Sequence, residues 1–240
     1  MDNKDISLFY DGYIQAQQNS GINDRIHELY RRLIKEGLNT ASKVLELGCG
    51  IGTMTFLLSK TVKRGHIEAV DISPESIGFC KHRIKSANTS FVTADIVNYD
   101  SILKDPDFIT LFDVIEHIPF ERHATLFDNL SRICGNATRI LVNIPNPAYV
   151  EYDISNQPET LQIVDQPVPL KFIVDNLSRS NLELVYFETY SIWAEHDYQF
   201  FIITKKKDFK EVLLSDKRNF FQKAAKKIKR TLIQLRYKYP

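Results

Sequence analysis

Glycines at alternating positions, Gly48, Gly50 and Gly52, join an apolar segment of this sequence to a helical pattern. Because glycine has no Cβ atom, such a junction lets the backbone turn sharply and approach a bound molecule closely. Glu46 places a carboxylate two residues before the first of these glycines. A carboxylate repels a diphosphate and attracts an ammonium group, so the spacing favours a nucleotide-like ligand that is cationic at the end beside Glu46.

The glycine spacing separates two families of nucleotide-binding folds. Dinucleotide-binding folds use G-x-G-x-x-G, which sets a diphosphate at a helix N-terminus, whereas this chain has G-x-G-x-G. The stretch 44–53 resembles the first motif of class I S-adenosylmethionine (SAM)-dependent methyltransferases, whose ligand carries an amino-acid group and a sulfonium. The resemblance implies cofactor contacts from Glu46, Gly48, Cys49, Gly50 and Gly52. A nicotinamide-dependent oxidoreductase remains the last alternative, because its third glycine would be misplaced.

Two further acidic landmarks follow in the order that is typical of this family. Asp71 ends a second apolar segment about 20 residues after the glycines, at the position that binds ribose hydroxyls. The segment 91–96 resembles the one whose acid hydrogen-bonds the adenine amino group, which implies that role for Asp95. The resemblance extends the predicted cofactor site to Asp71, Ile72, Asp95, Ile96 and Asp113.

A polar segment that contains Asp113, Glu116 and His117 follows the fourth apolar segment, and ligands of open α/β sheets bind where such strands end. It resembles the D/E-x-x-E-H segment of small-molecule O-methyltransferases, such as the ubiquinone-pathway enzymes, and of small-RNA 3′-end methyltransferases. In the RNA enzymes these acids and the histidine hold a divalent metal. A Mg²⁺ site formed by Asp113, Glu116, His117 and His196 is therefore one hypothesis, although aspartate shortens the first ligand.

Methyl transfer to a hydroxyl group requires a nearby base. The displacement at a sulfonium depends on proximity, but the hydroxyl must lose its proton, and histidine titrates near neutral pH. We expect His117 to be this base; alternatively, Glu116 and His117 cap the next helix or hydrogen-bond the SAM-binding backbone. His196 is the second candidate, because the connection between the last two strands leaves the sheet on the side of the glycines; an exposed turn is its alternative.

Apolar segments that alternate with helical patterns predict the elements that hold these residues. The expected strands are 43–47, 66–70, 90–93, 108–113 and 139–144, with helices beginning near residues 52, 74 and 120. Two β-rich runs, 182–192 and 198–204, predict a closing antiparallel hairpin. The predicted fold class is α/β: a Rossmann-like seven-stranded sheet, mostly parallel with an antiparallel last strand, and helices on both faces.

Three regions are expected along the chain. Residues 1–40 predict a helical lid, with apolar residues at helix spacing from Ile22 onward and aromatic residues at Tyr10 and Tyr13. Residues 41–205 predict the methyltransferase domain, in which the prolines between 145 and 169 exclude a helix and indicate a loop over the site.

Residues 206–240 predict a basic amphipathic helix. From residue 205 on, thirteen Lys or Arg stand against three Asp or Glu, a net charge of +10, which leaves the rest of the chain at −9. Apolar residues recur at steps of three or four from Phe221 to Leu235. Such a helix binds an anionic membrane surface, here through residues 208–240, or alternatively packs on the domain or in a dimer.

Composition indicates an ordinary globular chain of 240 residues, 43% hydrophobic and 25% charged. It contains no apolar run of about 20 residues and no leader pattern, so we expect a cytoplasmic protein, peripheral at the inner membrane face if the basic helix binds there. The acidic body makes nucleic acid an improbable partner. The sequence predicts a SAM-dependent methyltransferase that acts on an oxygen of a small-molecule or saccharide acceptor. The alternatives are an RNA 3′-end methyltransferase and a non-catalytic SAM-binding protein tethered by its tail.

Overall fold

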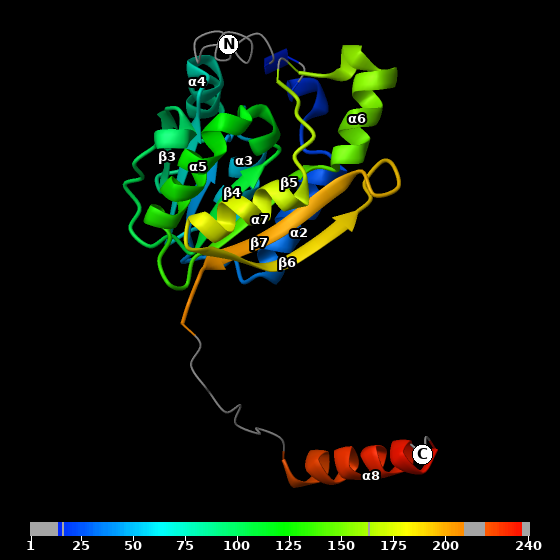
Figure 1. Ribbon diagram of the computed structural model, residues 1–240. Coiled ribbons are helices and arrows are strands. Elements are labelled where there is room, and N and C mark those ends of the chain that lie inside the picture. Colours follow the sequence, from blue (N-terminus) through cyan, green and yellow to red (C-terminus); the bar gives the residue numbers. More distant parts are fainter. Residues whose placement is uncertain (1–13, 16, 163, 209–218, 237–240) are drawn as a thin grey trace. The chain divides into compact units, whose positions relative to one another are not determined.

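The computed structural model describes residues 14–15, 17–162, 164–208 and 219–236 (Figure 1). The chain forms two compact units, Met1–Lys206 and Lys207–Pro240, and each is considered by itself. The aromatic positions Tyr10 and Tyr13 lie outside the described residues.

The first unit is built around a seven-stranded sheet of order β3-β2-β1-β4-β5-β7-β6 (Figure 1). The first five strands pair in parallel, and β7 runs antiparallel to both β5 and β6. The strands are β1 (Lys43–Leu47), β2 (His66–Asp71), β3 (Thr89–Thr93), β4 (Phe108–Phe112), β5 (Arg139–Pro145), β6 (Leu182–Tyr190) and β7 (Tyr198–Lys205). The predicted fold class is confirmed, and the strand order reverses between β1 and β4, where open α/β sheets bind ligands.

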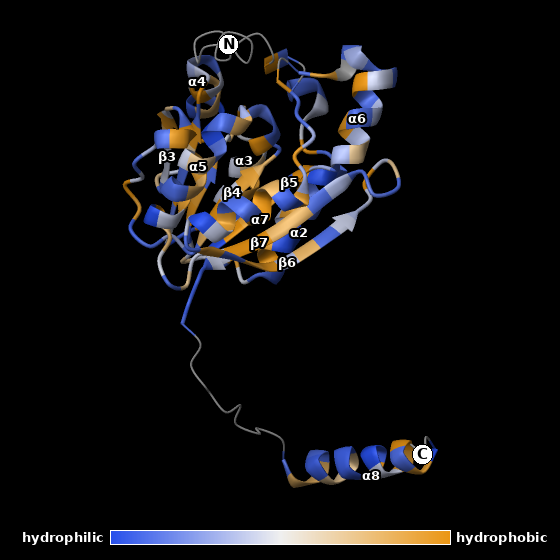
Figure 2. Ribbon diagram, in the orientation of Figure 1, coloured by the Kyte–Doolittle hydropathy of each residue, from blue (hydrophilic) through white to orange (hydrophobic). Residues whose placement is uncertain are grey.

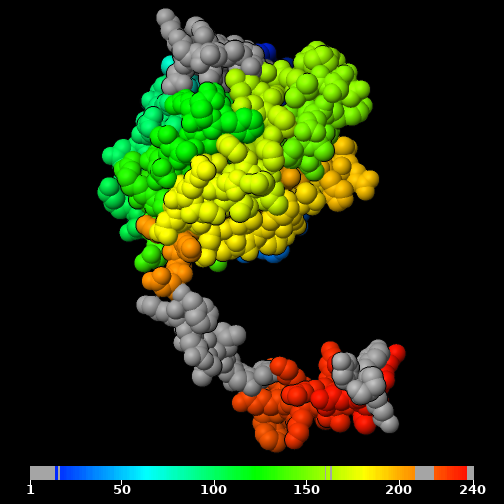
Figure 3. All heavy atoms as spheres, viewed as in Figure 1, coloured from blue at the N-terminus to red at the C-terminus, as the bar shows by residue number. Residues whose placement is uncertain are grey.

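Helices cover both faces of the sheet. On one face lie α2 (Asp24–Lys35), α3 (Thr53–Thr61) and α4 (Pro74–Arg83). On the other lie η1 (Ile96–Asn98), α5 (Phe120–Ile133) and α7 (Leu170–Arg179). The space-filling view shows the latter face, where α5 in green and α7 in yellow cover the strands (Figure 3). The remaining elements are η2 (Ile115–His117), α6 (Pro147–Asn156) and η3 (Pro158–Thr160).

Burial on both faces explains why the inner strands β1, β2, β4, β5 and β7 are largely apolar, and orange predominates in the sheet in Figure 2. Side chains alternate across a strand, so neighbours in β1 enter different cores. Val44 packs with the apolar residues of α2 and α3, whereas Leu45 and Leu47 pack with those of α5 and α7. This alternation also sends Glu46, which shares the face of Val44, toward Thr55 in α3.

The predicted loop between residues 145 and 169 is wrong, because α6 and η3 form there. Pro147 occupies the first turn of α6, where a missing N–H breaks no helical hydrogen bond. The side chain of Asn146 caps this turn, accepting the N–H of Ala148 at 3.1 Å. Proline therefore starts this helix, and α6 lies over the carboxyl end of the sheet.

The N-terminal helical pattern is interrupted where the sequence predicted continuity. Residues 14–15 and 17–20 are helical, but Gly21 has a φ of +55° and α2 begins only at Asp24. Asn23 caps α2 by accepting the N–H of Ile26 at 3.1 Å. Ile22 consequently precedes the helix and is 46% exposed.

The second unit contains α8 (Phe220–Arg236), in which no residue is buried. Its apolar positions and its lysines lie on different sides of the helix, as the orange and blue ribbon shows (Figure 2). Among the described residues, no helix has the length and apolar character that crossing a bilayer requires.

Candidate active site

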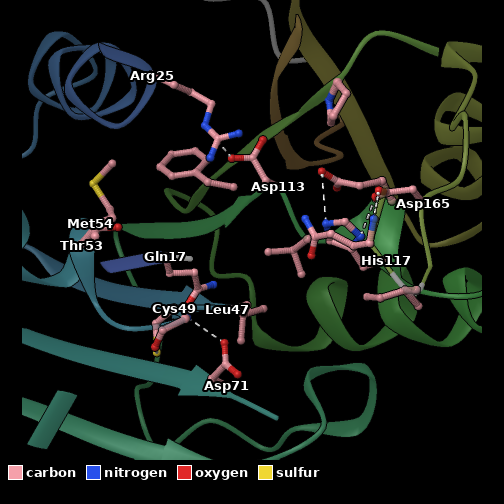
Figure 4. Close-up of a pocket in the computed structure, with 18 of the residues that line it drawn as sticks. Gln17, Arg25, Leu47, Cys49, Thr53, Met54, Asp71, Asp113, His117 and Asp165 are labelled. Carbon is pink, nitrogen blue, oxygen red and sulfur yellow. Dashed lines mark hydrogen bonds and ion pairs between the residues drawn. The ribbon is translucent and has the colours of Figure 1, made fainter. Parts of the chain in front are cut away.

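A cavity of about 400 Å³ lies at the carboxyl ends of β1, β2 and β4 (Figure 4). Loops after these strands form its floor, and residues before and within α2 and along α6 complete its walls. The predicted cofactor residues that line it are Glu46, Gly48, Cys49, Gly50, Asp71, Ile72, Asp95, Ile96 and Asp113. Gly52 is not among the lining residues.

The glycine loop is held in place by backbone geometry that glycine permits. The N–H groups of Gly48 and Cys49 donate to the carbonyl of Val70 in β2, at 2.8 and 3.0 Å. At Gly48 the φ is +77°, and a Cβ atom would lie 2.4 Å from Cγ2 of Val114. At Gly52 the φ is +82°, and a Cβ atom would lie 2.8 Å from the sulfur of Cys80. Gly48 thus lets the side chain of Val114 pack against the loop, while Gly52 lets α3 and α4 pack closely.

Asp71 is fixed by two backbone donors at the end of β2. Its Oδ2 accepts the N–H of Gly50 at 2.7 Å, and its Oδ1 accepts the N–H of Ser73 at 2.9 Å. The carboxylate is 8% exposed and lines the cavity. It is therefore oriented before any ligand binds, as an acceptor for hydroxyl groups requires.

Glu46 is a buried carboxyl group in the same floor. It is 4% exposed, and its Oε2 accepts a hydrogen bond from the hydroxyl of Thr55 at 2.6 Å. Burial raises the pKa of Glu46 to about 8, and the nearby Asp71 adds to the increase. A cation bound beside Glu46 would favour the ionised form of the carboxyl group. It would also bind strongly, because the carboxyl group is buried away from bulk water.

Asp95 lines the far side of the cavity and is held by neighbouring groups. Its Oδ1 accepts the N–H of Val97 at 3.1 Å and so caps η1, and its Oδ2 forms an ion pair with Arg122 of α5. Ile96 beside it is buried and lines the cavity. The carboxylate and this apolar neighbour together provide a polar edge and a flat wall for an aromatic ring.

Arg25 is a site residue that sequence reasoning missed. It projects from α2, and its Nε lies 3.1 Å from Oδ2 of Asp113, which follows β4 (Figure 4). Its Nη1 also donates to the hydroxyl of Tyr198 at 2.8 Å, and its guanidinium lies 5.5 Å from the ring centre of Trp193. These partners are distant in sequence, so no local spacing indicates the contact. The arginine fastens α2 to the edge of the cavity.

His117 is held by a segment that the sequence did not connect with it. Its Nδ1 donates to the carbonyl of Val164 at 2.5 Å and lies 3.0 Å from Oδ1 of Asp165, while its Nε2 lies 3.9 Å from Oε1 of Glu116. Burial disfavours the imidazolium, but the carboxylates of Glu116 and Asp165 outweigh burial and raise the pKa of His117 to about 9. Because a carbonyl only accepts, the neutral ring carries its proton on Nδ1, and Nε2 is the basic nitrogen.

Glu116 is part of the cavity wall, and its carboxylate is buried below the protein surface. The residue is 2% exposed, and within the part of the chain that is described neither Oε1 nor Oε2 has a hydrogen-bond partner. Burial raises its pKa above the ordinary range, with His117 opposing the shift. The alternative that Glu116 and His117 cap α5 does not match this geometry, since no side chain caps that helix.

His196 is not brought to the cavity. Its side chain is 60% exposed on the connection between β6 and β7, and its Nδ1 lies 3.3 Å from the hydroxyl of Thr189. The proposed metal set of Asp113, Glu116, His117 and His196 is not assembled either, because Asp113 faces Arg25 and His196 lies in solvent. Within the described ranges, no group of three His, Cys, Asp or Glu residues converges as metal ligands would.

The other half of the cavity is formed by α6 and the segment after it. Tyr149, Val150, Asp153, Leu161 and Gln162 line this half, which faces His117 and Asp165. The sequence does not identify these residues as part of the site, because the prolines between residues 145 and 169 predict an irregular loop. Residues of the predicted lid, among them Gln17, also line the cavity.

Residues 44–136 match the family model described as a methyltransferase domain. Among curated proteins, the malonyl-[acyl-carrier protein] O-methyltransferase of Priestia megaterium is 30% identical over 105 residues, 41% of this chain and 36% of that protein. The fatty-acid O-methyltransferase of Mycolicibacterium smegmatis is 23% identical over 136 residues, 57% of this chain and 49% of that protein. The chain therefore spans less than half the length of these relatives.

Solved structures share the fold at low sequence identity. The magnesium protoporphyrin IX methyltransferase (ChlM) from Synechocystis PCC 6803, crystallised with SAH, is 14% identical with a TM-score of 0.68, over 86% of this chain and 100% of that one. The methyltransferase domain of bacterial CtHen1-C is 21% identical with a TM-score of 0.60, over 76% of this chain and 97% of that one. These likenesses establish the architecture of the sheet and its helices.

Proposed function

We propose that this chain, which has the class I SAM-dependent methyltransferase fold and a methyltransferase domain over residues 44–136, transfers a methyl group from SAM to an oxygen of a small-molecule or glycan-type acceptor. One observation carries the proposal. The glycine loop, Glu46, Asp71 and Asp95 all line a single cavity at the point where the strand order reverses.

The lining residues fit the parts of SAM. Glu46 would receive the ammonium group, since its buried carboxyl lacks a cationic partner among the described side chains. Asp71 would accept the ribose hydroxyls, and Asp95 the adenine amino group between Ile72 and Ile96. Gly48, Cys49 and Gly50 line the cavity and would contact the ligand through the backbone of the loop, and Gly52 would maintain the loop conformation. The half of the cavity that α6 and the segment after it form, together with His117, is called the acceptor half. When bound, SAM supplies an electrophilic methyl group to this half.

We assign proton removal to His117. Asp165 and the carbonyl of Val164 hold Nδ1–H, so Nε2 is the atom that takes the acceptor proton. Asp165 acts through the histidine and is therefore a positioning residue. It fixes the tautomer and stabilises the imidazolium that forms as the hydroxyl loses its proton.

Replacement of Asp165 by Asn should move the pH profile of the reaction. Loss of the carboxylate removes one cause of the raised pKa of His117, so the rise of kcat/KM with pH should be centred at a lower pH. We expect kcat at neutral pH to change by no more than about tenfold. Kinetics from pH 6 to 10 measure this shift. Asp175→Asn, on the exposed side of α7, is the matched control, and an unchanged midpoint in Asp165→Asn would refute the positioning role.

Calorimetry with SAH and turnover of SAM against hydroxyl acceptors test the proposal as a whole. We expect 1:1 binding of SAH and release of SAH that depends on an acceptor. Failure to bind refutes the proposal, and binding without turnover favours the non-catalytic SAM-binding alternative. The RNA 3′-end alternative is disfavoured by the acidic cavity, because phosphate binding needs cations. Steep salt dependence of RNA affinity would favour it instead.

We further propose that α8 and its basic surroundings bind an anionic membrane surface, which would suit a lipid-linked saccharide acceptor. The support is charge complementarity and the apolar face of α8, where Ile228, Leu232 and Leu235 are 60–64% exposed.

Deletion of residues 208–240 should abolish cosedimentation with vesicles that contain anionic lipid. The intact chain should bind these vesicles and release them as salt is raised, and neutral vesicles are the control. A second variant, with the five basic residues between 223 and 230 changed to Gln, isolates the charge. Vesicle binding that persists after the deletion would rule out this role for α8.

A further inference from the structure

We infer that Glu116 binds a second hydrogen-bond donor of the acceptor, so that the acceptor carries a hydroxyl or amine next to the hydroxyl that His117 deprotonates. The inference rests on the proposed function and specifies its substrate class. Its first support is the state of Glu116 itself. The residue is 2% exposed and lines the cavity, and among the described residues both carboxylate oxygens are without a hydrogen-bond partner. Buried carboxylates are rarely left in this state, because a buried polar atom without a partner is destabilising.

A second observation that supports the inference is the distance between Glu116 and His117, the proposed base. Oε1 of Glu116 lies 3.9 Å from Nε2 of His117, too far for a direct hydrogen bond between them. Two acceptor atoms at this spacing match two donors on adjacent atoms of one molecule. A vicinal diol or an amino alcohol can give one hydroxyl to Nε2 and its neighbouring donor to the carboxylate. The contact with the carboxylate would hold the reacting oxygen in a fixed orientation. A displacement reaction is accelerated strongly when the reacting atoms are held in the correct geometry.

Its third support is the charge of the surrounding wall. Asp153 and Asp165 line the same half of the cavity as Glu116. Arg25 and Arg122 also line the cavity, but they are paired with Asp113 and Asp95. His117, with its raised pKa, adds one positive charge at neutral pH, but the carboxylates of Asp153 and Asp165 outnumber it. Among the residues described, the acceptor half is thus net acidic and favours neutral or cationic groups over carboxylates and phosphates. The fatty acid in the name of one relative is a carboxylate, so this wall predicts a different acceptor class here.

Matched acceptors separate this inference from the proposed function. The probes are cis-cyclohexane-1,2-diol, cis-2-aminocyclohexanol, cyclohexanol and cyclohexanecarboxylate, each tested by SAH release and by binding to the SAH complex in NMR. The wild-type chain should prefer the diol or amino alcohol over cyclohexanol by about tenfold or more in kcat/KM, and should bind the carboxylate least. Glu116→Leu, which removes both acceptor oxygens, should abolish that preference while SAH affinity stays within about twofold. Glu121→Leu, at an exposed position of α5, is the control and should keep the preference.

The outcomes distinguish failure of the inference about Glu116 from failure of the proposed function. If SAH binds and cyclohexanol or the carboxylate is used as well as the diol, the inference is wrong and the proposed function stands. The inference is also wrong, and the proposed function stands, if Glu116→Leu keeps the wild-type preference or if none of the probes binds to the SAH complex. If SAH itself does not bind, the proposed function fails and the inference fails with it.

Discussion

Replacing His117 with Ala should lower kcat by about 10²–10⁴-fold, the usual contribution of a general base, while SAH affinity remains close to that of the wild type. The reason is that His117 lies in the acceptor half, with Nδ1 engaged by Val164 and Asp165. Single-turnover kinetics at saturating SAM would measure the change. His196→Ala is the matched control, because that histidine is exposed outside the cavity and should leave kcat unchanged.

The pH profile provides an independent check on His117. Its pKa is raised to about 9, so at lower pH the ring is mostly protonated and lacks a lone pair for the acceptor proton. We therefore expect kcat/KM to rise about tenfold per pH unit and to level off near pH 9. The raised pKa also stabilises the folded chain at pH values below the unfolded pKa of about 6.5, and this contribution disappears as the pH rises through about 9. A rate that is flat from pH 6 to 9 would exclude His117 as the base.

Replacing Asp71 with Ala should weaken SAH binding by about 100-fold or more. Hydrogen bonds to a carboxylate contribute about 1.5–3 kcal/mol each, and the proposed site uses Asp71 for two ribose hydroxyls. The substitution also removes the acceptor of the N–H groups of Gly50 and Ser73, which loosens the glycine loop. Calorimetric titration with SAH measures the loss, and thermal denaturation shows whether the variant is folded.

Glu68 provides a control for Asp71 from the same strand. It is fully buried on the opposite face of β2, where it accepts hydrogen bonds from the hydroxyl of Ser101 at 3.0 Å and the N–H of Leu103 at 3.1 Å. Glu68→Gln should lower the melting temperature and leave the SAH affinity of the folded fraction unchanged. Equal losses of SAH affinity in both variants would mean that Asp71 has only a structural role.

Local sequence determined most of the sheet. Its predicted strands end within two residues of the observed ones, because strands buried on both faces are largely apolar and polar residues, Gly48, Gly65 or Pro145 lie at their ends. The sequence also predicts the residues that form the floor of the cavity. Gly48 follows β1 and adopts a positive φ, and Asp71 ends β2, so both positions are indicated by the residues next to them in the sequence. The five prolines between residues 145 and 169 predict a loop, but Pro147 occupies the first turn of α6, where proline is compatible with a helix.

Only the tertiary structure decided which side chains meet across the cavity. Arg25 reaches Asp113 from α2, and Asp165 reaches His117 from a segment that follows α6. The sequence predicted His117 as the first candidate base and His196 as the second. The fold buries His117 against two carboxylates and leaves His196 in solvent. Spacing along a chain encodes backbone conformation and the face of an element, but it carries no information on contacts between distant segments. The packing of the helices on the sheet therefore determined the surroundings of His117, the proposed base, and of Asp165, the residue proposed to position it.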